Sequence, residues 1–267
     1  MSVSLGPFVL SWSHLLLALT YFIALLVGWL VGRQRQVSIE PTLTAMLIAG
    51  LLMARLVFVL LYWQDYRSAP LGIIDIRDGG FSALGGLAGT FLLALYKAKR
   101  ERSLRIPLAA AVGAGALVWA LGGGLYSVIR AGQVVPQLNY QSLAGQQVSL
   151  EQFKGKPLVI NLWATWCPPC RREMPVLMQA QQNRPDLHFV FINQGELAHT
   201  IGQYLQSEDL ILTNLLLDTN QKTMRELGTA GLPSTLFYNA EGVLIHTHMG
   251  ELSTASLKHT LKKIAPP

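Results

Sequence analysis

Long apolar stretches alternate with short charged segments in the first half of the chain, and this pattern predicts helices that cross a membrane. Each stretch approaches the roughly 20 residues that a spanning helix needs. The four stretches are residues 8–31, 42–63, 79–97 and 108–129. The third is short and rich in glycine, which favours a tilted or broken helix. Arg55 is the one charge inside the second stretch, and such a charge either faces a cavity or partner or reaches the membrane interface.

From residue 146 the pattern changes to short apolar runs separated by amphipathic segments, which predicts an α/β domain. Residues 158–163 are apolar on both faces, as in a central buried strand, and residues 168–183 follow as a helix whose first turn tolerates prolines. The other expected strands are 147–150, 187–193, 215–217, 234–238 and 243–249, and the other expected helices are 196–207, 221–227 and 253–264. The polar residues 131–145 are expected to form a short linker.

We therefore expect a multi-domain chain. Residues 1–130 form an all-α transmembrane domain of four helices, residues 131–145 form the linker, and residues 146–267 form the α/β domain.

Charge separates the two halves and orients the predicted spans. Residues 1–137 contain eleven Lys and Arg against five Asp and Glu, whereas residues 138–267 contain ten of each. The basic residues gather in the first and third loops, around 33–35 and 97–105, so the positive-inside rule places these loops in the cytoplasm. Both termini and the α/β domain are then expected on the extracytoplasmic side. Because the basic residues cluster in loops between apolar stretches, orientation in a membrane accounts for their excess. We therefore expect no nucleic-acid binding.

The only two cysteines, Cys167 and Cys170, stand where strand 158–163 passes into helix 168–183. Two cysteines are too few for a disulfide scaffold or a four-thiolate zinc site, but they make one exchangeable disulfide. Cys167 lies at the helix start, where unpaired N–H groups and the helix dipole favour a thiolate. Cys170 lies one turn deeper and can resolve a mixed disulfide at Cys167. The pair predicts a redox-active disulfide without a cofactor or metal, with a static disulfide as the alternative.

The segments around the pair resemble a known family. Residues 155–175, with the Cys-Pro-Pro-Cys motif, and residues 231–235, Gly-Leu-Pro-Ser-Thr, are similar to the membrane-anchored thioredoxin-like reductases of the TlpA/ResA type. The resemblance covers residues 138–267 and implies a thioredoxin-like α/β fold with a cis peptide bond before Pro233. It also implies re-reduction by a DsbD-like membrane electron carrier.

The same resemblance assigns roles to individual residues. Cys167 attacks a substrate disulfide, Cys170 resolves the mixed disulfide, and Glu173 passes protons to and from Cys170. A charge on Glu173 would also disfavour ionisation of the thiols. The alternative for Glu173 is a solvated helix residue paired with an arginine. The candidate substrate-binding residues are Trp166, Pro168, Pro169, Leu232 and Pro233.

The first 130 residues resemble the bacterial prolipoprotein diacylglyceryl transferases. Residues 5–12, 54–62 and 77–86 carry this resemblance. The family's histidine is replaced by Leu84, and residues 122–126 lack the arginine and asparagine of a second family signature. Leucine cannot transfer a proton, and no anion clamp remains at the second position. We interpret this half as a degenerate transferase-like membrane module.

Together these features predict a thiol:disulfide oxidoreductase anchored in the bacterial inner membrane, with its thioredoxin-like domain in the periplasm and envelope-protein disulfides as substrates. Its expected direction is reduction, with donation of oxidising equivalents as the alternative. Two other classes stay open: a lipid-binding or lipid-modifying protein with a thioredoxin appendage, and a copper-handling thiol chaperone. His246 and His248 alternate along strand 243–249, so they share one face and are either metal ligands or part of a wet sheet surface.

Overall fold

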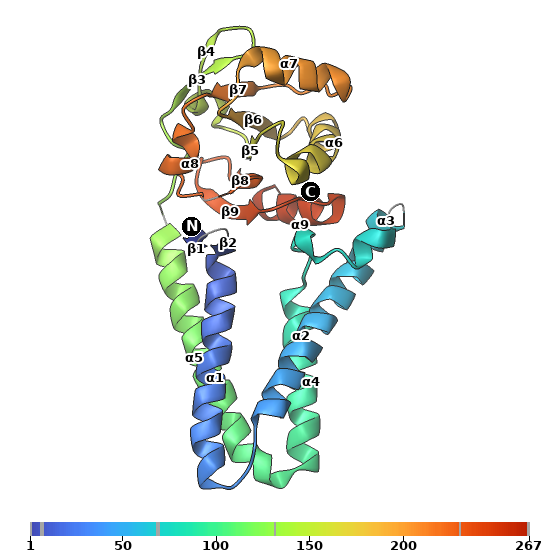
Figure 1. Cartoon of the computed structure of the whole chain (residues 1–267), viewed down its shortest axis with the longest axis vertical. Helices are drawn as coiled ribbons and strands as arrows, with labels where there is room; N and C mark the ends of the chain where they lie inside the picture. The colour runs from blue at the N-terminus through green and yellow to red at the C-terminus, as the bar shows by residue number, and fades with distance from the viewer. Residues whose placement is uncertain (1, 6–7, 68–69, 131, 230, 266–267) are drawn as a thin grey trace. The chain divides into compact units, whose positions relative to one another are not determined.

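A computed structural model describes residues 2–5, 8–67, 70–130, 132–229 and 231–265 of the 267-residue chain. Ala131, the first residue of the predicted linker, lies outside the described residues. The chain divides into two compact units, a helical unit of residues 12–76 and 80–129 and an α/β unit that contains residues 130–267. Figure 1 shows the elements of both units.

Four long helices form the helical unit: α1 (Trp12–Gln34), α2 (Glu40–Leu61), α4 (Ala83–Arg100) and α5 (Arg105–Arg130). The short elements between them are α3 (Trp63–Tyr66), η1 (Pro70–Ile73), η2 (Ile76–Asp78) and η3 (Arg102–Leu104). The expected helical region is therefore present, with four long helices among the described residues. The first begins at Trp12 and not at residue 8, because Phe8–Ser11 (β2) pairs with Ser2–Leu5 (β1) as an antiparallel hairpin.

Length and composition separate α4 from the other long helices. Within the described residues, the segments long and apolar enough to cross a membrane are Trp12–Gln34, Glu40–Leu61 and Arg102–Ile129. The helix α4 has 18 residues and carries three basic residues in its last turn. The prediction of four spans is thus supported for three segments, and the third predicted span is a shorter helix.

Glycines bring α2 and α4 into close contact. A Cβ atom placed at Gly89 would lie 2.6 Å from the Cβ atom of Met53, and one at Gly85 would lie 2.9 Å from the Met53 carbonyl oxygen. Only residues without a side chain permit this approach, as is common between membrane helices. The small residues of α4 therefore serve packing.

Arg55 is buried within the helical unit and binds the loop that precedes α4. Its Nη2 atom donates to the carbonyl oxygens of Gly72 and Asp75, each at 2.7 Å, while Nη1 donates to Gly80 at 2.8 Å. Its Nε atom donates to Ile73 at 3.0 Å. Backbone carbonyls thus satisfy a charge that would otherwise be costly to bury in an apolar helix. Of the two alternatives from the sequence, the structure supports a partner within the chain.

A seven-stranded sheet with four helices builds the α/β unit. The strands are β3 (Asn139–Ser142), β4 (Gln147–Ser149), β5 (Leu158–Trp163), β6 (His188–Gln194), β7 (Leu215–Asp218), β8 (Ser234–Tyr238) and β9 (Leu244–Met249). The helices are α6 (Pro168–Asn183), α7 (Ala198–Ser207), α8 (Lys222–Glu226) and α9 (Thr254–Ile264), with η4 (Leu150–Phe153) before β5.

The strands lie in the order β4-β3-β7-β6-β5-β8-β9. The strands β5, β6 and β7 are parallel, and β3, β8 and β9 pair antiparallel to their neighbours. This arrangement confirms the predicted thioredoxin-like fold. The bounds of β5, α6 and β8 agree with the ranges expected from the hydrophobic pattern.

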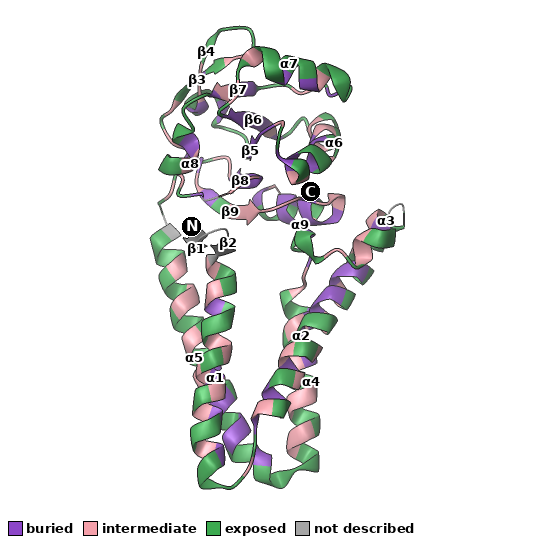
Figure 2. Ribbon diagram, viewed as in Figure 1, coloured by how far each residue is buried: buried purple, intermediate pink, exposed green. Residues whose placement is uncertain are grey.

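The core of this unit lies on both faces of β5, whose six residues are all buried (Figure 2). Val159 and Trp163 pack with Met174 and Leu177 of α6 on one face. Leu158, Ile160 and Leu162 contribute to a second cluster on the other face. A strand at the centre of the sheet with both faces covered is a rigid base for the segment that follows it.

The segment predicted as a linker is partly structured. β3 lies within residues 131–145 and pairs with both β4 and β7. Earlier still, the Val135 N–H group donates to the Gly242 carbonyl oxygen at 2.9 Å, and the Val135 side chain is buried. The folded unit therefore begins before residue 146, and the expected linker is shorter than predicted.

Candidate active site

The cysteine pair lies directly beyond the end of β5. Trp163, the last residue of the strand, is fully buried and anchors that end in the core, as predicted. A turn follows, closed by a 3.3 Å hydrogen bond from the Cys167 N–H group to the Ala164 carbonyl oxygen. Cys167 is the N-cap of α6, and it forms a disulfide with Cys170 at a Cα–Cα distance of 5.3 Å. The disulfide expected from the spacing is present.

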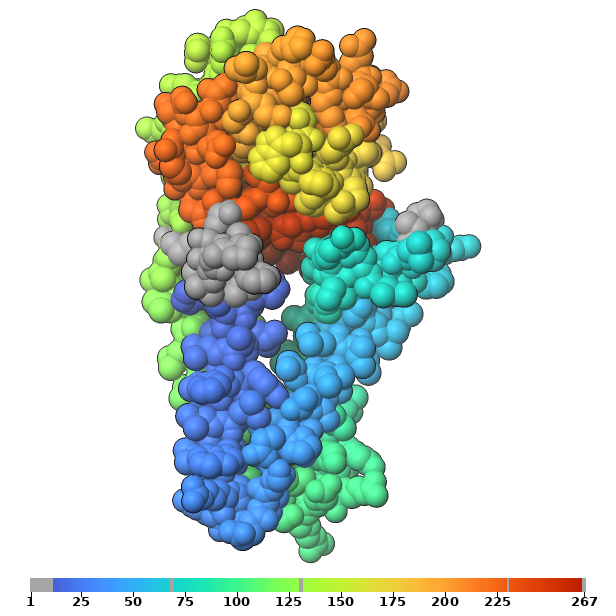
Figure 3. Space-filling model, viewed as in Figure 1, coloured from blue at the N-terminus to red at the C-terminus, as the bar shows by residue number. Residues whose placement is uncertain are grey.

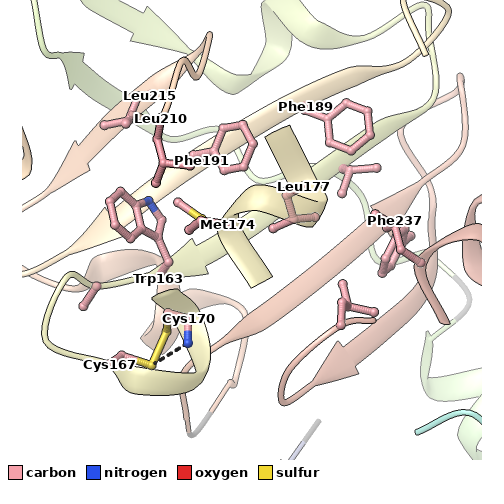
Figure 4. Close-up of a cluster of buried hydrophobic side chains, with 14 of the residues drawn as sticks. Trp163, Cys167, Cys170, Met174, Leu177, Phe189, Phe191, Leu210, Leu215 and Phe237 are labelled. Carbon is pink, nitrogen blue, oxygen red and sulfur yellow. Dashed lines mark hydrogen bonds between the residues drawn. A yellow bond between two sulfur atoms is a disulfide. The ribbon is translucent and has the colours of Figure 1, made fainter. Parts of the chain in front are cut away.

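The two sulfurs differ in their access to solvent. Cys170 is fully buried in the same cluster as Met174 and Leu177, whereas Cys167 retains 4 % exposure (Figure 4). Trp166, the residue before Cys167, is 65 % exposed and lies outside the core. The helix α6 itself reaches the surface of the molecule (yellow, Figure 3). A substrate therefore has better access to Cys167 than to Cys170.

Two prolines remove hydrogen-bond donors from the start of α6. Pro168 and Pro169 occupy the first two helical positions and have no N–H group. The Cys170 N–H group donates to the Sγ atom of Cys167 at 3.4 Å (Figure 4). A helix start normally presents several free N–H groups to its N-cap. Here the Cys167 sulfur has fewer donors within α6 than such an N-terminus normally supplies.

Glu173 lies one turn after Cys170 and is fully buried. Its Oε1 atom accepts a hydrogen bond from Nδ2 of Asn161 at 2.7 Å, and its Oε2 atom accepts one from the Leu252 N–H group at 3.0 Å. The solvated alternative for Glu173 is therefore wrong. The neighbouring arginines bind elsewhere: Arg171 pairs with Glu208 and Arg172 with Glu251.

Burial raises the pKa of the Glu173 carboxyl from 4.5 to about 8, and the hydrogen bonds from Asn161 and Leu252 oppose this only in part. The neighbouring Glu251 also contributes to this raised pKa. With the disulfide formed, the carboxyl of Glu173 is thus mainly protonated at pH 7. In this state it holds a transferable proton. The effect of Glu173 on thiol ionisation in the reduced form stays a prediction.

A second loop lies at the same end of the sheet as the cysteines. The peptide bond from Leu232 to Pro233 is cis, as the family resemblance implied. Pro233 is buried, and its carbonyl oxygen accepts a 2.9 Å hydrogen bond from the Gly250 N–H group. Ser234 begins β8 opposite Leu162 of β5, so the loop and the turn that carries Cys167 leave adjacent strands at one edge.

The two histidines of β9 have partners within the fold. The ring of His246 lies 5.9 Å from that of Phe237. Nε2 of His248 is hydrogen-bonded to the Glu251 carbonyl oxygen at 3.2 Å. Across the part of the chain that the structure describes, no three His, Cys, Asp or Glu side chains gather as a metal site.

Two polar residues near the pair were not identified from the sequence. Asn161 is the one polar side chain of β5, and its position inside an otherwise apolar strand was an available signal. Glu196 follows β6 and binds Thr165, which lies two residues before Cys167. Its sequence signal is weaker, because Thr165 and Glu196 are 31 positions apart.

A thioredoxin-like fold with a buried C-x-x-C disulfide at a helix start and a cis-proline loop defines a thiol-disulfide oxidoreductase. The chain belongs to the redoxin family, whose model matches residues 130–263.

Curated relatives agree with this class. The thiol-disulfide oxidoreductase ResA of Bacillus cereus is 25 % identical over 173 residues, which cover 63 % of this chain and 99 % of ResA. The thioredoxin-like protein YneN of Bacillus subtilis is 30 % identical over 135 residues, or 50 % of this chain and 79 % of YneN. The thiol:disulfide interchange protein DsbE of Vibrio cholerae is 29 % identical over 135 residues, or 50 % and 72 %.

Among solved structures, a thioredoxin-family thiol:disulfide interchange protein from Chlorobium tepidum is 26 % identical, with a TM-score of 0.45. The match covers 49 % of this chain and 95 % of the Chlorobium tepidum chain.

Proposed function

We propose that this protein is a thiol:disulfide reductase anchored in the bacterial inner membrane, with its α/β unit on the periplasmic side. The helical unit, residues 1–130 in this proposal, supplies the anchor through its three long apolar segments. The basic loops around residues 33–35 and 97–105 support the orientation. Disulfides persist on that side of the membrane, so a reductase there has substrates.

The start of α6 carries the assignment of direction. A dithiol couple is oxidising when the protein stabilises its reduced, thiolate form. Pro168 and Pro169 withhold two N–H groups from the sulfur of Cys167, and the nearby cations of Arg171 and Arg172 pair with carboxylates. The thiolate therefore receives little stabilisation, which favours the disulfide in this chain and makes the dithiol a good reductant.

In the proposed reaction, the Cys167 thiolate attacks a substrate disulfide, forms a mixed disulfide and releases one substrate thiolate. Cys170 then gives up its proton and attacks the Cys167 sulfur, which restores the Cys167–Cys170 disulfide and releases the second substrate thiolate. The two substrate thiolates take up two protons. One electron pair thus passes from the enzyme to the substrate.

Glu173 donates a proton to Cys170 and accepts it back. When a donor dithiol reopens the disulfide, Cys170 leaves as a thiolate and takes a proton from the neutral Glu173 carboxyl. The resulting carboxylate accepts that proton again when Cys170 attacks the mixed disulfide. The raised pKa of Glu173 suits it to donate in the first of these steps.

The proposed substrate surface surrounds Cys167. Trp166, Pro168 and Pro169 form the rim of this surface, and Leu232 with Pro233 borders it. The main-chain N–H and C=O groups of Leu232 make no hydrogen bond to other described residues. They are free to pair with an extended substrate segment, as an exposed strand edge does.

The electron donor in this proposal is a DsbD-like membrane carrier. The transferase-like character of the helical unit stays a prediction. Leu84, at the position of the transferase histidine, is 80 % exposed, and a leucine offers no group for proton transfer.

The reduction potential of the Cys167–Cys170 couple in the full chain tests the direction. We expect a value near that of thioredoxin, about −270 mV. A value near about −120 mV, typical of a strong oxidant, would reverse the assignment. Insulin reduction with dithiothreitol as electron source provides the matching activity assay, with Cys167→Ser as the inactive control.

A further inference from the structure

The turn between β5 and α6 is bound from outside by one carboxylate. Oε2 of Glu196 accepts a hydrogen bond from the Thr165 N–H group at 2.7 Å, and Oε1 accepts one from the Thr165 hydroxyl at 2.5 Å. Thr165 is the second residue of the turn that ends at Cys167. Glu196 therefore binds both the main chain and the side chain of the segment that presents the attacking sulfur.

The sheet register brings these residues together. The strands β5 and β6 are parallel, and Trp163 lies opposite Asn193. The chain leaves both strands at the same edge, so Thr165 and Glu196, two and three residues further on, face each other. Gly195 turns the chain here with a φ of +83°, a conformation that glycine adopts without strain.

Asn193 orients the carboxylate. Its Nδ2 atom donates to Oε2 of Glu196 at 2.7 Å, and Asn193 itself is fully buried. Three donors, two from Thr165 in the turn and one from Asn193 of β6, thus hold the carboxylate in one geometry. These three hydrogen bonds make Glu196 a firm anchor for the turn.

We propose that Glu196 is a positioning residue for disulfide exchange, which holds the Thr165 turn so that the Cys167 thiolate meets the incoming disulfide along its S–S axis. The proposal rests on the proposed function. The Cys167 thiolate forms a bond to one substrate sulfur while the substrate S–S bond breaks, and the leaving sulfur departs as a thiolate. Glu196 contributes orientation and exchanges neither electrons nor protons.

The pH profile of a single-turnover reaction separates orientation from electrostatics. The fully reduced full chain is mixed in detergent with excess 5,5′-dithiobis(2-nitrobenzoate), and the release of nitrothiobenzoate is followed from pH 5 to 10. At high pH every thiol is ionised, so the plateau rate reports how well Cys167 is placed. The midpoint of the profile reports how readily Cys167 ionises.

The variants are Glu196→Ala, Thr165→Val and the double variant, each with an intact fold by thermal unfolding. We expect each single variant to lower the plateau rate about 5-fold or more, in line with the loss of an orienting contact. Because Glu196 acts through Thr165, we expect the double variant to be no more than about twofold slower than the slower single variant. Thr165→Ser, which keeps the hydroxyl, should restore the plateau.

Glu151→Ala is the matched control, because it removes an exposed glutamate whose carboxylate pairs with Lys154. Plateau rates within twofold of wild type in both single variants would overturn the proposal, as would losses that multiply in the double variant. A change of the midpoint alone would assign Glu196 an electrostatic role and also overturn it. Failure of the proposed function would look different, since the wild-type chain would then leave insulin unreduced.

Discussion

Asn161 donates a hydrogen bond from Nδ2 to Oε1 of Glu173 over 2.7 Å, in the buried space between β5 and α6. The same Nδ2 atom donates to the hydroxyl oxygen of Thr235 at 2.9 Å. Asn161 thus fixes the carboxyl group with a neutral amide. A cation in its place would stabilise the carboxylate and lower the pKa of Glu173, whereas an amide lets burial dominate.

Replacement of Glu173 by Gln tests its proton transfer. The oxidised chain is reduced by dithiothreitol at pH 7 and at pH 9, and the wild-type rate is divided by the Glu173→Gln rate. This ratio removes the ionisation of dithiothreitol, which is common to both. We expect wild type to be about 10-fold faster or more at pH 7 and the advantage to shrink at pH 9, where Glu173 is ionised. A ratio near one at pH 7 would remove Glu173 from the proton path.

The same carboxyl predicts how stability depends on pH. The pKa of Glu173 is raised from 4.5 to about 8, so the folded oxidised chain binds more protons than the unfolded chain between these values. Stability due to Glu173 is therefore complete below about pH 4.5 and is lost as the pH rises towards 8, by about 1.4 kcal/mol for each pH unit in this window. Thermal unfolding at pH 5 and pH 9 should show a larger loss in wild type than in Glu173→Gln. An equal loss in both would contradict the buried, protonated state.

Restoring one main-chain donor at the start of α6 tests the redox assignment. Pro169→Ala adds an N–H group at the second helical position, from which N-caps commonly accept. The Cys167 thiolate gains a hydrogen bond, so we expect the reduction potential to rise by about 30 mV, the equivalent of roughly 1.4 kcal/mol.

Pro175→Ala is the matched control for this change, because Pro175 lies inside the same helix. Its added N–H group lies beyond the first turn of α6, so the potential should stay within about 10 mV of wild type. Equal shifts in Pro169→Ala and Pro175→Ala would show that the prolines act through helix stability alone.

Removing the resolving sulfur should capture the physiological partner. In Cys170→Ser, the mixed disulfide at Cys167 cannot be resolved, so we expect a protein adduct that dithiothreitol releases. Mass spectrometry of the adduct in Cys170→Ser cells, compared with Cys167→Ser cells, identifies the substrate. Recovery of bound lipid without a protein adduct would instead favour the lipid-modifying alternative.

Arg55 should hold the loop of residues 72–80 in its conformation. Its guanidinium donates to four carbonyl oxygens in residues 72–80, and Arg55→Ala leaves these acceptors and the loop without that partner. Lysine keeps the charge but lacks the planar guanidinium group with its several donors, so Arg55→Lys should protect the loop from proteolysis only in part. We expect limited proteolysis in detergent to cleave residues 70–80 fastest in Arg55→Ala, then in Arg55→Lys. Protection equal to wild type would show that other contacts hold the loop.

The hydrophobic pattern predicted β5 and α6 to the residue because each signal there is local. Five apolar residues and one asparagine mark a strand with both faces covered, and a cysteine followed by two prolines marks a helix start. β3 was missed because Tyr140 is its only buried residue and the other three are polar. A strand whose partners come from distant parts of the chain leaves little trace in its own sequence.

The environment of Glu173 could not be predicted from the sequence for a related reason. Two arginines precede it, which suggested a solvated ion pair, but their partners Glu208 and Glu251 come from other elements. The partners of Glu173 itself lie on β5 and at residue 252, 12 and 79 positions away. Proximity in the chain predicted which residues surround the cysteines, and the tertiary fold decided which of them are ionised.

The four acceptors of Arg55 are all main-chain carbonyl oxygens. These hydrogen bonds therefore depend on the backbone conformation of the loop and not on most of its side chains. Gly80 is the exception, because a Cβ atom there would lie 2.6 Å from Nη1 of Arg55. Among descendants of this sequence, residues 73–76 can therefore diverge while the loop keeps its shape, provided that Arg55 and Gly80 are inherited together, and that Gly79, whose φ is +64°, stays a glycine.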